Sequence, residues 1–221
     1  MSFRIFISRS ENEVLKLAEF CKNRNWTIFA KSLISFQLVP FQISSDFQVV
    51  FFPSPRAAQF FLDNSSTPNL SNTLVACAGE QTATTIRKMG LEVHFIPSQS
   101  GNVLKVRAEF QEWLGERKVL YVGSNLARKS VLTNLNENQW SFLPVYKTKF
   151  ESDRVPESDI YVFSSPSNVQ SFLMSNLLPI HAEVIAWGST TAEELAKNSI
   201  NTKHILTNSN EDELISFLAK Y

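Results

Sequence analysis

"VACAGEQTATTIRKMGLEVHFIP", at residues 75–97, decides the fold because the same construction returns as "VIAWGSTTAEELAKNSINTKHIL" at 184–206. Each stretch reads as an apolar strand, a Gly-x-x-Thr-Ala turn, a helix and a second strand. Strands that alternate with helices in this way predict parallel sheets covered by helices on both faces.

Other blocks of the chain also match in order, at a nearly constant offset. The matching pairs are "RIFISRS" (4–10) with "KVLYVGS" (118–124), "NWTIF" (25–29) with "QWSFL" (139–143), and "VVFFPSPRAAQFFL" (49–62) with "IYVFSSPSNVQSFL" (160–173). Ordered matches of this kind indicate an internal duplication. A chain of 221 residues is long enough for two such domains.

Two stretches do not fit a buried strand, because they mix charged and apolar residues in an extended pattern. They are "KSLISFQLVP" (31–40) and "FLPVYKTKFE" (142–151), and we expect them to be linker strands that cross between the domains. Two crossings make one lobe discontinuous. The expected lobes are therefore residues 1–33 with 150–221, and residues 38–143.

Local signals predict the individual elements. Ser10 and Glu13 form a Ser-x-x-Glu capping box before a helix. Gly90 is expected to end the helix that follows the first Gly-x-x-Thr-Ala turn, and residues 92–96 are expected to form a strand. The two cysteines, Cys21 and Cys77, are expected to be buried core residues, since no spacing suggests zinc or a redox pair.

Composition excludes several classes of protein. Lys plus Arg equals Asp plus Glu, 21 each, which argues against a nucleic-acid-binding surface. No apolar run approaches about 18 residues, so no membrane partner or span is expected. The N-terminal stretch lacks a basic region followed by an apolar run, so we expect no signal peptide and a cytoplasmic protein. A monomer is expected, since no exposed apolar stripe stands out.

Four predicted strand-to-helix turns share one chemistry. They are "PSPRA" (53–57), "GEQTA" (79–83), "SSPSN" (164–168) and "GSTTA" (188–192). Ligands of open parallel sheets bind beyond the carboxyl ends of the strands. There, unpaired N–H groups at a helix start and Ser or Thr hydroxyls favour anions. Two turns per lobe predict a ligand with several anionic groups, although simple helix capping would also explain each turn alone.

Catalytic signals are few. The sequence has no dinucleotide or Walker fingerprint, no Gly-x-Ser-x-Gly and no cluster with metal-ligand spacing. His94, His181 and His204 have no carboxylate or cysteine at triad spacing. Tyr146 lies on an expected linker strand, and its phenol can donate a proton to a departing oxygen. The alternative is a tyrosine that anchors the linker by packing.

Taken in order, the two Ser-Pro turns, the two Gly-x-x-Thr-Ala turns, "MGLEVHFIP" and "PVYKT" resemble the uroporphyrinogen-III synthase family over nearly the whole chain. The resemblance implies an α/β protein of two flavodoxin-like doubly wound parallel-sheet domains, joined by a two-stranded β linker, with the active site in the cleft. It implies a lyase that uses neither cofactor nor metal. Its substrate is hydroxymethylbilane, a linear tetrapyrrole with eight carboxylates. The enzyme cyclises it with loss of water and inversion of the last ring, giving uroporphyrinogen III.

The resemblance also implies roles for particular residues. Tyr146 falls on the tyrosine proposed to assist departure of the substrate hydroxyl. The implied substrate-binding residues lie on the four turns and after the first strand: Thr82, Thr191, Ser54, Ser165, Gly79, Gly188, Ser189, Thr190 and Arg9. Pro53 stands where the family usually has threonine, and Ser199 where a glycine commonly ends the last helix.

Other functions remain open on the sequence alone. The main alternative is a catalytically inactive two-lobed module of the same fold that binds an anionic ligand. A nucleotide- or sugar-phosphate-binding protein would need more glycine than the six residues present. The partners expected are the octacarboxylate substrate and, transiently, the deaminase upstream.

Overall fold

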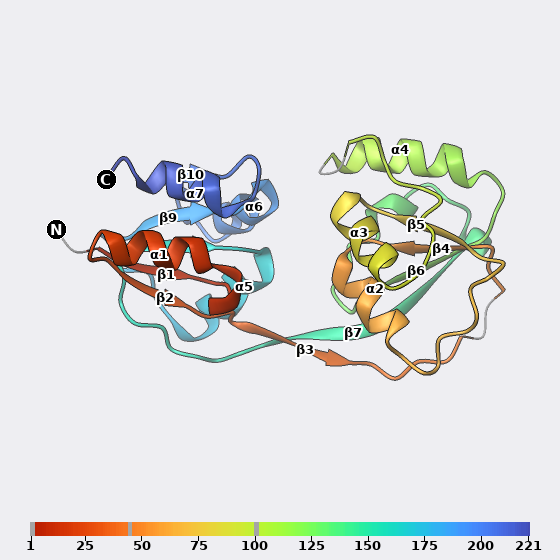
Figure 1. Ribbon diagram of the computed structural model, residues 1–221, viewed down its shortest axis with the longest axis horizontal. Helices are drawn as coiled ribbons and strands as arrows, with labels where there is room; N and C mark the ends of the chain where they lie inside the picture. The colour runs from red at the N-terminus through yellow and green to blue at the C-terminus, as the bar shows by residue number, and fades with distance from the viewer. Residues whose placement is uncertain (1–2, 44–45, 100–101) are drawn as a thin grey trace. The chain divides into compact units, whose positions relative to one another are not determined.

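Two units make up the chain in the computed structural model, which describes residues 3–43, 46–99 and 102–221. Unit 1 is Met1–Ser35 with Lys149–Tyr221, and unit 2 is Phe36–Thr148 (Figure 1). The chain therefore passes from one unit to the other within β3 (Ile34–Leu38) and again within β7 (Trp140–Phe150).

Unit 1 holds a parallel sheet in the order β10-β9-β8-β1-β2. Its strands are β1 (Arg4–Ile7), β2 (Thr27–Ala30), β8 (Ile160–Phe163), β9 (Glu183–Ala186) and β10 (His204–Ile205). Helices α1 (Leu15–Asn23) and α7 (Glu211–Leu218) share one core with Ile5 and Val162. Helices α5 (Pro166–Ser175) and α6 (Ser189–Lys197) share the other core with Phe6 and Phe163.

Unit 2 repeats this arrangement with the strand order β3-β7-β6-β4-β5. Its further strands are β4 (Val49–Phe52), β5 (Leu74–Cys77) and β6 (Val119–Ser124). Helices α2 (Pro55–Leu62) and α3 (Glu80–Lys88) pack with Val50 and Phe52. Helix α4 (Val103–Leu114) and the 3-10 turn η2 (Ser130–Leu132) lie on the other face with Val49 and Phe51. Both units thus have the two-sided cover that the alternating pattern predicts.

The duplication reaches the register of the sheets. Val49 lies opposite Leu74 in unit 2, and the residues that the sequence match equates with them, Ile160 and Glu183, lie opposite each other in unit 1. The pair Val49–Val119 likewise corresponds to Ile160–Ile5. Since register depends on pairing between distant segments, this agreement supports duplication of a whole folded unit.

The two copies differ where the chain runs from β6 to β7. The sequence match equates Trp26 with Trp140, but Trp140 pairs with Val119 whereas Ile5, the counterpart of Val119, pairs with Ile28. The pairing is therefore displaced by two residues, one full period of the side-chain alternation, so each side chain keeps its face of the sheet. Helix α1 of unit 1 is also replaced in unit 2 by η2 and a second 3-10 turn, η3 (Glu137–Gln139).

Two predicted elements are shorter than expected. The strand predicted at 92–96 is reduced to a single bridge between Phe95 and Ala76. The cause is His94, whose Nδ1 accepts the Val75 N–H at 3.1 Å, so a side chain takes the place of a backbone acceptor. The helix predicted after Ser10 begins as a separate 3-10 turn, η1 (Glu11–Glu13), in which the Glu13 carboxylate accepts the Ser10 N–H at 3.0 Å.

Other local predictions hold. Cys21 and Cys77 are both buried free thiols, and burial raises the pKa of Cys21 to about 11. Gly90 follows the end of α3 with a φ of 85°. Within residues 3–43, 46–99 and 102–221, no helix is both long and apolar enough to cross a membrane.

Ser199, the counterpart of Gly90, supplies a prediction about stability. Its φ is 59°, so a residue with a Cβ occupies the left-handed conformation after α6. Ser199→Gly should raise the free energy of unfolding by about 1 kcal/mol, because that conformation strains any residue other than glycine. Urea denaturation would measure the gain, and Gly90→Ser should lower stability by a similar amount. A Ser199→Gly protein no more stable than the wild type would contradict this account.

Candidate active site

The carboxyl edge of each sheet gathers the residues singled out from the sequence. In unit 1, Arg9 follows β1, the Ser165 turn follows β8 and the Gly188 turn follows β9. These three strands are parallel neighbours, so their ends meet at one edge. Ser189, Thr190 and Thr191 belong to the first turn of α6 at that same edge.

Unit 2 has the corresponding set. Ser54 follows β4 and Gly79 follows β5, with Thr82 in the first turn of α3. Tyr146 pairs with Ser124, the last residue of β6, and thus lies at the carboxyl edge of the same sheet. The predicted site residues therefore form two groups, one in each unit.

The two Ser-Pro turns are helix caps. The Ser54 hydroxyl oxygen accepts the Ala57 N–H at 3.2 Å, and the Ser165 oxygen accepts the Asn168 N–H at 3.3 Å. A proline follows each serine as the first helical residue, where its missing N–H costs nothing. Capping uses the oxygen of each serine and leaves its hydrogen available to a ligand.

The two Gly turns share one geometry. The Gly79 carbonyl accepts the N–H groups of Thr82 and Ala83, both at 3.1 Å. The Gly188 carbonyl accepts those of Thr191 and Ala192, also at 3.1 Å. The preceding amides at each helix start have no acceptor within the helix, which makes them donors for an anion.

Glu80 is an anion at the start of α3, where an anionic ligand is expected. The Arg87 guanidinium lies 2.6 Å from its carboxylate. This pair offsets the negative charge on the unit 2 edge. The counterpart of Glu80 in α6 is Ser189, which needs no such partner.

Thr82 and Thr191 occupy equivalent positions and are both buried residues, with 4% and 2% of their surface exposed. Neither hydroxyl has a hydrogen-bond partner within the part of the chain that the structure describes. Completely buried polar atoms are normally paired within the protein, whereas partly accessible ones can pair with water or a ligand. Neither hydroxyl is completely covered, so each can still reach a ligand. The two hydroxyls recur at the same place in both repeats.

Arg9 places a cation beside the Gly188 turn. Its guanidinium lies 4.1 Å from the ring centroid of Trp187, the residue before Gly188, and 3.8 Å from the Glu13 carboxylate. Burial lowers the pKa of Arg9, while Glu13 and Glu211 act to raise it, and an arginine remains charged in this situation. The Nε atom is buried without a partner among the described residues. That atom is covered, but the Arg9 side chain as a whole is 28% exposed, so the rest of the guanidinium can still meet an anion.

Tyr146 is packed as a linker anchor would be. Its ring stacks on Phe60 with centroids 5.0 Å apart and meets Phe36 edge-on at 5.7 Å. Only 7% of the residue is exposed. Within the described part of the chain its hydroxyl has no hydrogen-bond partner, so the packed ring holds an uncommitted phenol.

Sequence reasoning missed several polar or aromatic residues at the unit 1 edge: Ser8, Ser164, Asn168 and Trp187. A comparison of the two repeats contains a signal for all four. The corresponding residues in unit 2 are Val122, Pro53, Ala57 and Ala78. Polar and aromatic residues at positions where the other copy is apolar indicate a role specific to unit 1.

A family model described as uroporphyrinogen-III synthase HemD matches residues 19–216. The chain belongs to this family. As a member it is a lyase of haem biosynthesis, which cyclises hydroxymethylbilane to uroporphyrinogen III with loss of water and inversion of the last ring. The reading as an inactive binding module is not favoured.

Two solved structures share the fold of this chain over nearly their whole length. The uroporphyrinogen-III synthetase of Helicobacter pylori 26695 is 18% identical, with a TM-score of 0.70 over 100% of this chain and 99% of that one. A mutant uroporphyrinogen III synthase of the extremely thermophilic bacterium Thermus thermophilus is 12% identical, with a TM-score of 0.68 over 100% of both chains. A search of curated protein sequences found no significant match.

Proposed function

We propose that the carboxyl edges of both sheets bind the carboxylates of hydroxymethylbilane and that Tyr146 assists departure of its hydroxyl group. The observation that carries this assignment is the pair Thr82 and Thr191, two buried residues at equivalent places whose hydroxyls are without partners among the described residues. The substrate carries eight carboxylates, which can accept a hydrogen bond from each of the two hydroxyls. The protein offers further donors to the substrate carboxylates. In unit 1 they are Arg9, Ser165, Gly188, Ser189 and Thr190, and in unit 2 they are Ser54 and Gly79.

Beyond holding the substrate in the reactive orientation, the reaction needs little from the protein. The hydroxyl group leaves as water once a proton donor protonates it. This leaves a cation, the protonated azafulvene, which its own pyrrole nitrogen stabilises, so one proton donor at the departing oxygen is sufficient. The Tyr146 phenol is that donor. The remaining task is to hold the chain so that the substituted carbon of the last ring attacks the reactive methylene. Binding the carboxylates at many points supplies this geometry.

We also propose a finer description of the fold. Counted along the chain, the strand order of unit 1 is 2-1-3-4-5, which supports a flavodoxin-like domain. Residues 31–40 and 142–151 serve as the linker strands, between a lobe of residues 1–33 with 150–221 and a lobe of residues 38–143. Transient contact with the deaminase that supplies the substrate would limit its spontaneous closure to the type I isomer.

Product analysis tests the activity directly. Freshly generated hydroxymethylbilane is supplied to the purified protein, the products are oxidised, and type I and type III porphyrins are separated. Mostly type III product is the expected result. Type I product alone, at the spontaneous rate, would overturn the assignment and leave a binding module with the same fold.

Thr82→Val and Thr191→Val should each raise KM by about tenfold. Valine keeps the shape of threonine and removes only the hydroxyl, and a hydrogen bond to a charged group is worth about 1.5–3 kcal/mol. Initial rates over a range of substrate concentrations would measure the change. Thr84→Val is the matched control, because Thr84 lies on the same helix α3 but is exposed. Equal KM values for all three variants and the wild type would remove the threonines from the site.

A further inference from the structure

We propose that Asn168 is a positioning residue that turns the Ser165 hydroxyl into a dedicated donor for a substrate carboxylate. The inference rests on the proposed function of the unit 1 edge, and gives a role to a residue that the sequence alone did not single out. Asn168 is the third residue of α5 and is only 3% exposed.

The orientation of the Asn168 amide follows from its partners. The Leu33 N–H lies 2.8 Å from Oδ1, and an N–H group can bond only to the oxygen of the amide. The nitrogen Nδ2 must then face the two serines, where it donates to Ser164 Oγ at 3.2 Å and Ser165 Oγ at 3.0 Å. The backbone before β3 thus determines which end of the amide meets the turn.

Both acceptor sites of the Ser165 hydroxyl oxygen are consequently occupied. It accepts from Nδ2 of Asn168 at 3.0 Å and from the backbone N–H of the same residue at 3.3 Å. A hydroxyl oxygen has two acceptor sites, so the remaining function of the group is to donate its hydrogen away from them. Carboxylates only accept, and this arrangement favours them over ligands that donate.

Ser164 is held by other hydrogen bonds and cannot shift to donate to Ser165 in place of the Asn168 amide. Its hydroxyl donates to the Ser8 carbonyl at 2.6 Å and lies 3.1 Å from the Ser8 hydroxyl, while its N–H donates to that hydroxyl at 2.8 Å. These bonds hold the turn to the end of β1. In unit 2 the corresponding residues are Pro53 and Ala57, and the Ser54 oxygen accepts only the Ala57 N–H among the described residues. The device is therefore specific to unit 1.

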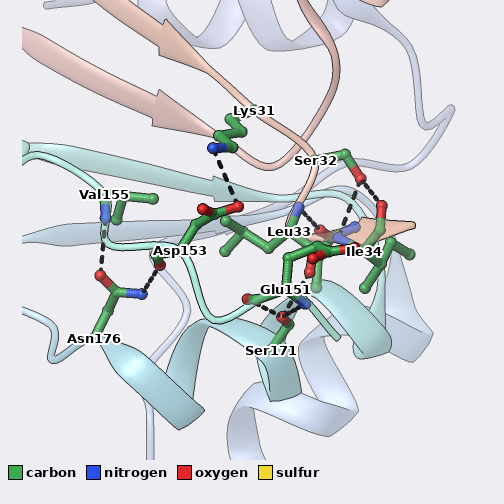
Figure 2. A network of polar contacts seen from close by, with 10 residues as sticks. Lys31, Ser32, Leu33, Ile34, Glu151, Asp153, Val155, Ser171 and Asn176 are labelled. Carbon is green, nitrogen blue, oxygen red and sulfur yellow. Dashed lines mark hydrogen bonds and ion pairs between the residues drawn. The ribbon is translucent and has the colours of Figure 1, made fainter. Parts of the chain in front are cut away.

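Ser171 in α5 and Asn176 directly after it bind Leu33 and residues 151–155 independently of Asn168. Figure 2 shows Ser171 beside Leu33 and Glu151. Its hydroxyl lies 2.6 Å from the Leu33 carbonyl and 2.9 Å from the Glu151 carbonyl. Asn176 likewise binds the backbone of Asp153 and Val155 (Figure 2). Removal of the Asn168 amide therefore leaves these segments attached, and its effect on Ser165 can be measured separately.

Asn168→Ala tests the proposal, since alanine occupies the same helical position in α2. We expect KM for hydroxymethylbilane and the Kd for uroporphyrinogen III, titrated anaerobically, to rise about tenfold while kcat changes less than about twofold. Asn168→Asp keeps an oxygen to accept the Leu33 N–H but replaces the Nδ2 donor with a second oxygen. That oxygen should accept the Ser165 hydroxyl hydrogen and so take it from the substrate, and binding should weaken at least as much. Ser171→Ala is the control: it should lower Tm without changing either constant.

A double-variant cycle separates positioning from general destabilisation. If Asn168 acts through the Ser165 hydroxyl, Asn168→Ala should cause no further loss of binding in a Ser165→Ala background. The proposal would be overturned if the fold-change in Kd of the double variant equalled the product of those of the two single variants. An unchanged Kd in Asn168→Ala would also overturn it. Absence of type III product from the wild type would instead overturn the proposed activity, while the Kd values still report on Asn168.

Discussion

Replacing Tyr146 with phenylalanine should lower kcat for type III formation by about 100-fold while leaving a measurable rate, because a positioned general acid contributes on the order of 10²–10⁴-fold. The residual rate comes from the azafulvene, which forms slowly without assistance. The ring contacts with Phe60 and Phe36 do not involve the hydroxyl, so the variant should fold normally. Initial rates of type III formation, with type I measured in the same samples, provide the test.

Tyr121→Phe is the matched control for this experiment. Tyr121 lies on β6 and is 5% exposed, and burial, followed by the charge of Tyr146, raises its pKa. It shares the sheet with Tyr146 but is given no role in the reaction, so kcat should be retained. If Tyr146→Phe also retained the wild-type kcat, Tyr146 would be a packing residue and the proton donor would lie elsewhere.

The largest effect on stability is expected from Phe172→Ala, which should lower the free energy of unfolding by about 3–5 kcal/mol. Phe172 is fully buried on α5, and the rings of Phe6, Tyr161 and Phe163 surround it with centroids 5.2 to 6.0 Å away. The loss would combine the transfer energy of the ring with the cavity left behind. Denaturant unfolding would measure the total change.

Phe61→Ala is the same change in the other repeat. Phe61 is fully buried in α2, next to Phe41 and Phe52 with centroids 5.5 and 5.6 Å away. Each unit has its own core, so hydrogen exchange should show lost protection in β1, β8 and β9 for Phe172→Ala and in β4 to β6 for Phe61→Ala. Equal loss across all six strands in both variants would argue against separate cores.

Much of the fold follows from short-range patterns. The Ser-Pro caps of α2 and α5 and the glycine after α3 lie where the sequence predicts them, because a cap depends on residues within one helical turn. The internal match also predicts which strands correspond. The register of β4 with β5 and of β8 with β9 agrees with that match.

Other features depend on residues that are distant in sequence. The strand expected at 92–96 is interrupted because the His94 side chain reaches Val75, 19 residues away. Asn168 is oriented by Leu33, 135 residues away, and Ser164 is held by Ser8, 156 residues away. A polar side chain on a helix shows no such partner until both segments are folded.

The sequence by itself determined the repeated parallel α/β units, the four turns at the strand ends and the family, because periodicity and capping are local and the duplication repeats them. Only the tertiary structure decided which donors remain unused at those turns. The Thr82 and Thr191 hydroxyls are without partners among the described residues, and the Ser165 hydroxyl is aimed by Asn168. The direction of a hydroxyl depends on every donor and acceptor around it, and here several of those groups come from distant parts of the chain.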